Sequence, residues 1–154
     1  MEKDKQESNV ICKYEVGYTT GTFDLFHVGH LNLLENAKKY CNILIVGVST
    51  DELVQSYKGV LPIIPFEDRI RIIEALKCVD KAIPQTSMNK LVALERIHYD
   101  VLFHGDDWKN TELYNDIENK LKEKGIPCIY FPYTTNVSSR EIRKKIEEKR
   151  GKKE

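Results

Sequence analysis

The chain has 154 residues, 41% of them hydrophobic, so it can fill one ordinary core but is too short for two domains. Its 24 lysines and arginines balance 24 aspartates and glutamates, so no global charge draws it to nucleic acid or to a membrane surface. A small charged ligand would have to be held by local geometry.

The four cysteines lie far apart and none forms a CxxC pair, which argues against a zinc site or a redox motif. Buried thiols in a reducing cytoplasm are the simpler interpretation. The leader "MEKDKQESN" lacks the apolar core of a signal peptide, and no stretch approaches the length of a membrane span. We expect a cytoplasmic protein with a polar leader over 1–13, a single domain over 14–148 and a charged tail over 149–154.

Strand and helix patterns then alternate along the chain, without repeats or flexible linkers. The run "ILIVGVS" is almost entirely apolar, as in a strand that is covered on both faces of a parallel sheet. Apolar spacings of three and four residues mark the helices, and glycines, prolines and capping residues mark their ends. In chain order we predict a strand over 10–20, a helix from 31 to about 42, a strand over 43–49, helices over 49–59 and 66–79, a strand over 80–85, a helix over 90–99, a strand opening into a loop over 100–107, a helix over 111–125, a strand over 126–133 and a helix over 140–150.

This alternation predicts an α/β fold, a Rossmann-like three-layer sandwich with a mostly parallel central sheet of about five strands. Ligands of such sheets bind beyond the carboxyl ends of the strands, near the point where the strand order reverses. Those ends are therefore where we look for functional residues.

The first strand runs into "GTFDLFHVGH", which contains two of the four histidines. Gly21 allows a tight turn, Gly29 allows close approach to the helix start, and the free amides there favour an anion such as phosphate. His27 and His30 lie about one helical turn apart, so both imidazoles can point at the same guest and donate hydrogen bonds to it. This pattern suits a reaction at phosphorus.

Two plainer interpretations of the histidine pair exist. A metal site would need a third ligand, and His98 and His104 lie on other predicted elements without obvious convergence. The other alternative is a pair of buried histidines whose ring nitrogens are hydrogen-bonded within the core. Two histidines flanking a glycine at a strand-to-helix turn are, however, not an ordinary core pattern.

The same stretch resembles the HxGH motif of the nucleotidyltransferase superfamily, and its Thr-Phe-Asp is similar to the cytidylyltransferase branch. The likeness continues in "STDELVQSYKG", "EDRIRIIEALKCVDKAIP" and "HGDDW", the last being similar to glycerol-3-phosphate cytidylyltransferases. These stretches keep their order from about Tyr14 to Lys145, which is far more specific than a lone HxGH.

The resemblance implies transfer of a cytidylyl group from CTP to a small phosphate ester, most simply glycerol 3-phosphate, with release of pyrophosphate. His27, His30 and Lys58 would be the catalytic residues, and Mg²⁺ would be carried in with the triphosphate rather than held by a protein metal site. Family members commonly form homodimers, so a homodimer is implied as well. The implied nucleotide-binding residues are Thr22, Phe23, Gly29, Asp106, Thr134, Val137, Ser138, Ser139 and Arg140. The implied substrate-binding residues are Asp24, Arg69, Lys77, Asp107 and Trp108.

Several of these assignments have a structural alternative. Lys58 and Arg69 could be solvated helix residues, and Asp24 could simply favour a helix dipole. Asp106 and Asp107 could be turn formers.

The chain departs from the family before its last helix, where "YTTNVSSRE" stands in place of a sequence like RTEGIST. Tyr133 occupies the position of a phosphate-binding arginine, and Lys77 replaces another arginine. Arg140 could supply the missing cation, or it could be an exposed helix residue.

Three other readings of the function remain. "SSREIRKK" also resembles adenylyltransferases of the same superfamily, so the base is less certain than the reaction. The acceptor could be another polyol phosphate, phosphocholine or phosphoethanolamine. A nucleotide-binding module without turnover is the alternative from a different class. Aminoacyl-tRNA synthetases share the histidine motif, but the chain has no room for their anticodon-binding parts.

Overall fold

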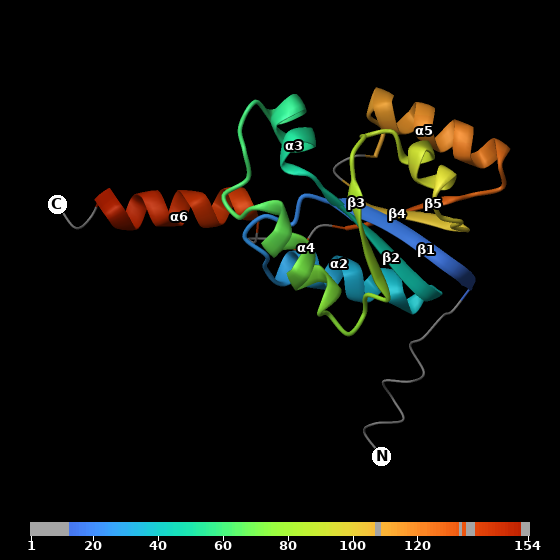
Figure 1. Ribbon diagram of the computed structural model, residues 1–154, viewed down its shortest axis with the longest axis horizontal. Coiled ribbons are helices and arrows are strands. Elements are labelled where there is room, and N and C mark those ends of the chain that lie inside the picture. Colours follow the sequence, from blue (N-terminus) through green and yellow to red (C-terminus); the bar gives the residue numbers. More distant parts are fainter. Residues whose placement is uncertain (1–12, 107–108, 133, 135–137, 152–154) are drawn as a thin grey trace, which may run out of the picture.

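The structure is a computed structural model, which describes residues 13–106, 109–132, 134 and 138–151. Figure 1 shows a central sheet with helices on both of its faces, as the alternating sequence pattern predicts. The strands are β1 (Tyr14–Gly21), β2 (Cys41–Ser49), β3 (Lys81–Gln85), β4 (Val101–Gly105) and β5 (Cys128–Phe131). The helices are α2 (Val28–Lys39), α3 (Asp51–Lys58), α4 (Phe66–Glu74), the 3₁₀ helix η1 (Lys90–Glu95), α5 (Glu112–Glu123) and α6 (Ser139–Gly151).

The five strands lie in the order β3-β2-β1-β4-β5, and each neighbouring pair is parallel. The longest ladder joins β1 to β2, from Tyr14 beside Cys41 to Gly21 beside Val48. The predicted Rossmann-like α/β fold is confirmed. The strand order reverses at β1, since β2 lies on one side of it and β4, which comes later in the chain, lies on the other.

Apolar side chains of β2 fill both faces of the sheet, as its nearly unbroken apolar run predicts. Leu44, Val46 and Val48 pack with residues of α2 and α4, whereas Ile45 packs on the opposite face with Tyr18 of β1 and residues near α5. Burial of such side chains provides the main free energy of folding, at about 1.5–3 kcal/mol for each. The two cores fix the strands whose carboxyl ends carry the site.

Two predicted helices are shorter in the structure. The expected helix over 66–79 ends at Glu74, because Val79 enters the core and the carboxylate of Asp80 accepts a hydrogen bond from Leu44 N at 2.8 Å. The expected helix over 90–99 forms only the 3₁₀ helix η1. Tyr99 leaves it to stack on Tyr18, with ring centroids 5.0 Å apart.

The helix ends follow ordinary capping chemistry. Thr50, rather than Ser49, caps α3 by accepting a hydrogen bond from Leu53 N, and Gly59 ends that helix with a left-handed φ of 75°. Ser138 caps α6 by accepting from Glu141 N at 3.0 Å, which fits the Ser138–Glu141 spacing of a capping box. The helix then runs to Gly151, into the segment expected to be a charged tail.

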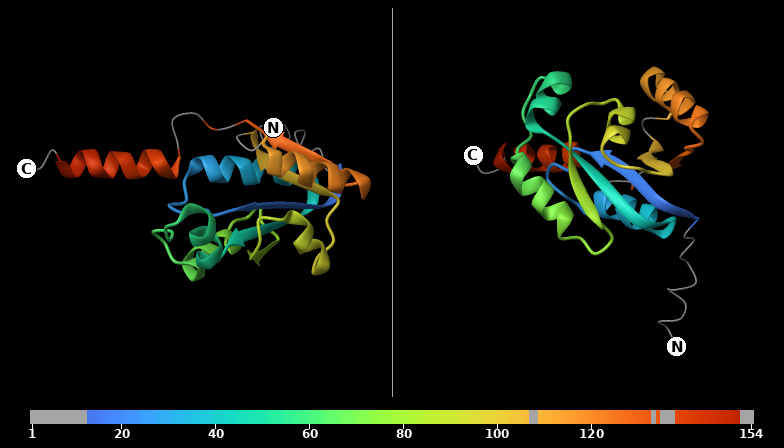
Figure 2. Two further views of the ribbon diagram at one scale, coloured as in Figure 1. Left: turned by 90° about the horizontal axis from the view of Figure 1, so that it is seen from above. Right: turned by 45° about the vertical axis from the view of Figure 1, so that its right-hand side comes forward.

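The last helix stands apart from the sandwich. Figures 1 and 2 show α6 projecting away from the body of the molecule, and none of its residues is buried. Among the described residues, no helix is both long and apolar enough to cross a membrane.

Candidate active site

A pocket of about 1350 Å³ opens at the carboxyl ends of the first four strands, where the strand order reverses. The start of α2 forms one side of it, and the last residues of α3 and the first turns of α6 form another. The structure brings most of the predicted site residues together here. Those that line the pocket are Thr22, Phe23, Asp24, His27, Gly29, His30, Lys58, Thr134, Ser138, Ser139 and Arg140.

The histidine turn, by which we mean residues 21–30, is organised by hydrogen bonds from its own backbone. His27 is the N-cap of α2, and its Nδ1 accepts from Gly29 N at 3.0 Å. His30 Nδ1 in turn accepts from His27 N at 3.3 Å. Because both Nδ1 atoms are acceptors, the proton of each neutral ring is on Nε2. The rings stack with centroids 3.8 Å apart, so two Nε2–H donors lie side by side in the pocket wall.

Both imidazoles are neutral in this environment. Burial lowers the pKa of His27, and burial together with the neighbouring His27 ring lowers the pKa of His30 to about 3, against a weaker opposing effect of Asp24. Phe23 and Phe26 flank the His30 ring, each at 5.4 Å between centroids. The pair can therefore donate hydrogen bonds to an oxyanion at neutral pH without gaining or losing a proton.

Gly29 is required by the histidine turn itself. A Cβ at this position would lie 2.8 Å from His27 Cε1 and 2.9 Å from His27 Nδ1, so any side chain would push the ring out of its capping position. The sequence predicted that Gly29 lets a ligand approach the helix. In the structure the group that approaches it is the first histidine.

A second side of the pocket carries positive charge, and we call Lys58, Arg140 and Arg143 the cationic wall. Lys58 is the last residue of α3, and the two arginines are on the first turns of α6. Burial lowers the pKa of Lys58, and the guanidinium groups of Arg143 and Arg140 lower it further, while Asp24 opposes them. Cations that disfavour one another's charge in this way are suited to a polyanionic guest.

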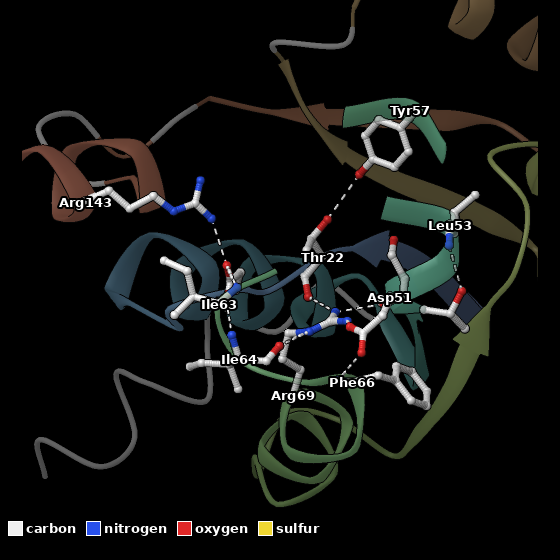
Figure 3. Close-up of polar contacts among 12 residues, drawn as sticks. Thr22, Asp51, Leu53, Tyr57, Ile63, Ile64, Phe66, Arg69 and Arg143 are labelled. Atoms are coloured by element: carbon white, nitrogen blue, oxygen red, sulfur yellow. Dashed lines mark hydrogen bonds and ion pairs between the residues drawn. The ribbon is translucent and has the colours of Figure 1, made fainter. Parts of the chain in front are cut away.

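Asp24 lies at the edge of the pocket, but protein groups already occupy its carboxylate. It accepts from Ile63 N and Ile64 N, each at 2.9 Å, and from Arg143 Nη2 at 2.8 Å. Figure 3 shows these bonds converging from the loop before α4 and from α6. Burial alone would raise the pKa of Asp24, but these hydrogen bonds and the Arg143 charge lower it overall. Both carboxylate oxygens thus have protein partners, and the substrate-binding role implied for Asp24 by the family likeness stays a prediction.

Arg69 is also placed differently from its prediction. Its side chain is fully buried, and it donates to Ile64 O at 2.8 Å, to Thr22 O at 2.7 Å, to Ser49 O at 2.8 Å and to Asp51 Oδ1 at 2.7 Å (Figure 3). It is neither a solvated helix residue nor a lining residue of the pocket. Its guanidinium fastens the ends of β1 and β2 to the starts of α3 and α4.

Comparison with known proteins agrees with this geometry. A family model described as cytidylyltransferase-like matches residues 18–145. The chain belongs to this family. It is 38% identical over 128 residues to a glycerol-3-phosphate cytidylyltransferase of Bacillus spizizenii, a match that covers 82% of this chain and 92% of the relative. The predicted assignment to the cytidylyltransferases, and hence to the nucleotidyltransferases, is confirmed.

Solved structures show the same fold. A lipopolysaccharide core biosynthesis protein from Thermoplasma volcanium superimposes with a TM-score of 0.65 at 27% identity, covering 79% of this chain and 97% of that one. A protein of unknown function from Archaeoglobus fulgidus gives a TM-score of 0.56 at 17% identity, covering 80% and 93%. At 17% identity the second likeness concerns the fold alone.

Several residues named from the family likeness lie elsewhere or outside the described residues. Lys77 is exposed in the turn between α4 and the first residue of β3, at the end of the sheet opposite the pocket. Asp106 is exposed just after β4 and is not among the pocket's lining residues. Asp107, Trp108, Tyr133 and Val137 lie outside the described residues.

One part of the pocket was not indicated by any sequence motif: a polar chamber on the face of the sheet that carries η1 and α5. His104 Nε2 lies 3.1 Å from Tyr114 Oη and 3.4 Å from Thr20 Oγ1. Lys90 is only 2% exposed and its Nζ lies 5.8 Å from the Tyr114 ring centroid. All four residues line the pocket.

Burial determines the charge states in this chamber. It lowers the pKa of Lys90 to about 7, and together with the nearby Lys90 it holds the pKa of His104 well below its usual value. No local sequence pattern indicated the burial of Lys90, because a lysine directly after an Asn N-cap is only mildly unfavourable for a helix dipole and is most often exposed.

Proposed function

We propose that the chain transfers a cytidylyl group from CTP to glycerol 3-phosphate, giving CDP-glycerol and pyrophosphate. The observation that carries the proposal is the pair of neutral Nε2–H donors at the start of α2, facing a pocket with a cationic wall. The Bacillus relative supports the choice of CTP and of this acceptor.

The reaction needs alignment and charge stabilisation rather than covalent catalysis. An oxygen of the acceptor phosphate attacks the α-phosphorus, a new P–O bond forms, and the bond from the α-phosphorus to the bridging oxygen breaks. Pyrophosphate leaves with the electron pair. His27 and His30 would donate to oxygens of the α- and β-phosphates, where charge develops in the transition state, and Lys58 would offset charge on the leaving group.

The remaining nucleotide contacts come from the same rim of the pocket. The start of α6 offers the hydroxyl of Ser138, which accepts from Glu141 N, and the side chain of Arg140. Ser139 is proposed as a neighbouring contact through its backbone, since its hydroxyl donates to Asp24 O at 2.6 Å. Thr134 lies across from α2, where its Oγ1 accepts from Asn32 Nδ2 at 3.1 Å. The backbone at Thr22 and Phe23 lines the same pocket. Asp106, which does not line it, and Val137, which lies outside the described residues, stay proposed contacts on the family likeness alone.

The polar chamber is the proposed acceptor subsite. Lys90 is buried, and no anionic side chain of the described residues is paired with it. A buried ammonium without a counter-charge is costly, and a substrate phosphate would compensate it. Asp107 and Trp108 stay proposed acceptor contacts. Arg69 and Lys77 are left out of the site because of where the structure places them.

The proposal includes Mg²⁺, which would enter with the triphosphate and neutralise charge on its oxygens. In the part of the chain that the structure describes, no group of three or more His, Cys, Asp or Glu side chains could hold a metal ion. We also propose a cytoplasmic homodimer whose product feeds the synthesis of a cell-surface polymer. The proposals of Mg²⁺, of a homodimer and of a polymer pathway rest on the family likeness.

Initial rates of pyrophosphate release test the proposal, with CTP and ATP compared in parallel at saturating Mg²⁺. The acceptor panel contains glycerol 3-phosphate, other polyol phosphates, phosphocholine and phosphoethanolamine. We expect the highest kcat/KM with CTP and glycerol 3-phosphate. A preference for ATP would make the chain an adenylyltransferase, and another preferred acceptor would correct the substrate. Absence of turnover with every pair would favour a nucleotide-binding module.

A further inference from the structure

The ammonium of Lys90 lies against an aromatic ring in the polar chamber. Its Nζ is 5.8 Å from the centroid of the Tyr114 ring, which is within the range of a cation–π interaction, and both residues line the pocket. Lys90 belongs to η1 and Tyr114 to α5, and both residues are buried. The protein thus places its own cation on an aromatic face that would otherwise attract a cationic ligand.

Both members of this pair are held by buried hydrogen bonds. Tyr99 Oη donates to the backbone oxygen of Lys90 at 2.9 Å. Tyr114 Oη lies 3.1 Å from His104 Nε2, and these two rings meet edge to face with centroids 4.7 Å apart. The backbone of Lys90 and the ring of Tyr114 are therefore fixed before any ligand binds.

The charge of the polar chamber has one sign. Burial and the nearby Lys90 hold the pKa of His104 well below its usual value, so the imidazole between the hydroxyls of Tyr114 and Thr20 is neutral. The four residues of the chamber thus supply one ammonium, three neutral groups and no carboxylate. In the described part of the chain no ion pair includes Lys90. Because a buried charge is little screened by solvent, this ammonium attracts a phosphate and repels a second cation.

We propose that Lys90, seated on the Tyr114 ring, determines the class of acceptor: it admits phosphate esters with an uncharged polyol tail and excludes those with an ammonium tail, such as phosphocholine and phosphoethanolamine. This inference rests on the proposed function, because it names the acceptors that the same subsite takes. The ammonium repels an amine-bearing tail and also covers the ring face on which such a tail would stack. Specificity then comes from a residue that rejects the wrong acceptor as well as binding the right one.

The relative use of acceptors tests the inference. Initial rates of pyrophosphate release at pH 7, with saturating CTP and Mg²⁺, give kcat/KM for glycerol 3-phosphate, phosphocholine and phosphoethanolamine. We define the specificity ratio as the value for glycerol 3-phosphate divided by the value for each amine ester. In the wild type this ratio should be about a hundredfold or more. In Lys90→Met it should fall by about tenfold or more, because the amine esters lose a repelling charge together with the phosphate contact.

Two further variants serve as comparisons. Lys90→Arg keeps a cation at this position and should keep most of the specificity ratio. Lys13→Met is the matched control, since Lys13 Nζ lies 5.9 Å from the centroid of the Tyr14 ring at the end of β1 far from the pocket. Its specificity ratio should equal that of the wild type.

The outcomes separate the inference from the proposed function. A specificity ratio in Lys90→Met equal to that of the wild type would overturn the inference, whether the rates fall together or do not change, and would leave the proposed reaction intact. A wild-type preference for an amine ester would overturn both the inference and the proposed acceptor. Wild-type protein without turnover of any acceptor would overturn the inference together with the proposed reaction.

Discussion

The two sides of the pocket are held together in different ways. The histidine turn is fixed from within, since each imidazole accepts a backbone hydrogen bond from the same turn and the two rings stack. The cationic wall is assembled from the end of α3 and the start of α6, and Asp24 joins the start of α6 and the loop that follows α3 to the turn. One side is local in sequence, and the other joins segments more than 100 residues apart, as the 119-residue separation of Asp24 and Arg143 shows.

This difference suggests that the two sides of the pocket have different functions. Donors that are already aligned contribute most where charge develops in the transition state, so changes in the histidine turn should act on kcat. Cations held through one shared carboxylate should act on nucleotide affinity. The following changes test that division, beginning with the largest expected effect.

Replacing the second histidine should have the largest effect on activity. His30→Ala removes one transition-state donor and the ring that stacks on His27, so kcat should fall by about 10²–10³-fold or more. Pyrophosphate release measures kcat, and circular dichroism checks that the fold is retained. Near-normal turnover in a folded His30→Ala protein would contradict the assignment of the site.

Replacing the buried arginine should have the largest effect on stability. Arg69→Met leaves Asp51 and the carbonyls of Thr22, Ser49 and Ile64 without their donor, so the free energy of unfolding should fall by about 3–5 kcal/mol. Denaturant titration measures this change. Arg71→Met, which alters an exposed residue of the same helix, serves as the control and should differ little from the wild type. Equal stability of the two variants would reject the structural role of Arg69.

A smaller change within the histidine turn tests whether the position of the His27 ring, and not only its presence, is needed for catalysis. Gly29→Ala would place a methyl group against the His27 ring and should lower kcat by about tenfold, with little change in the KM for CTP. Gly151→Ala is a suitable control, because a Cβ there meets no other atom. An unchanged kcat in Gly29→Ala would mean that the position of the ring is not critical.

The pH dependence of acceptor binding should give the smallest effect. Burial lowers the pKa of Lys90 to about 7, so its ammonium form is lost as the pH rises through that value. The acceptor KM should therefore increase about fivefold between pH 7 and pH 8. In Lys90→Met the acceptor KM should be higher and should not show this step. The acceptor phosphate titrates alike with both proteins, so the ratio of the two profiles isolates Lys90, and a flat ratio would contradict its role.

The sequence predicted the structure correctly where a pattern involves only neighbouring residues. The apolar run of β2, the turn at Gly59 and the spacing of His27 and His30 depend on neighbouring residues, and the structure agrees with each of them. Arg69 and Lys90 could not be placed in this way. A charged residue is most often on the surface, and these two are buried only because the fold brings distant segments around them.

Asp24 also shows that a local sequence pattern does not reveal contacts between distant segments. Its position in the motif indicated contact with substrate, but its partners Ile63, Ile64 and Arg143 are 39, 40 and 119 residues away. No spacing within the motif reveals such partners.

Isotope tracing with glycerol 3-phosphate carrying ¹⁸O on its non-bridging phosphate oxygens, incubated with CTP and Mg²⁺, tests the central claim most directly. If the acceptor phosphate attacks the α-phosphorus in this pocket, mass spectrometry will find all of the label in CDP-glycerol and none in pyrophosphate. Label in pyrophosphate, or a nucleotide product without label, would contradict the account.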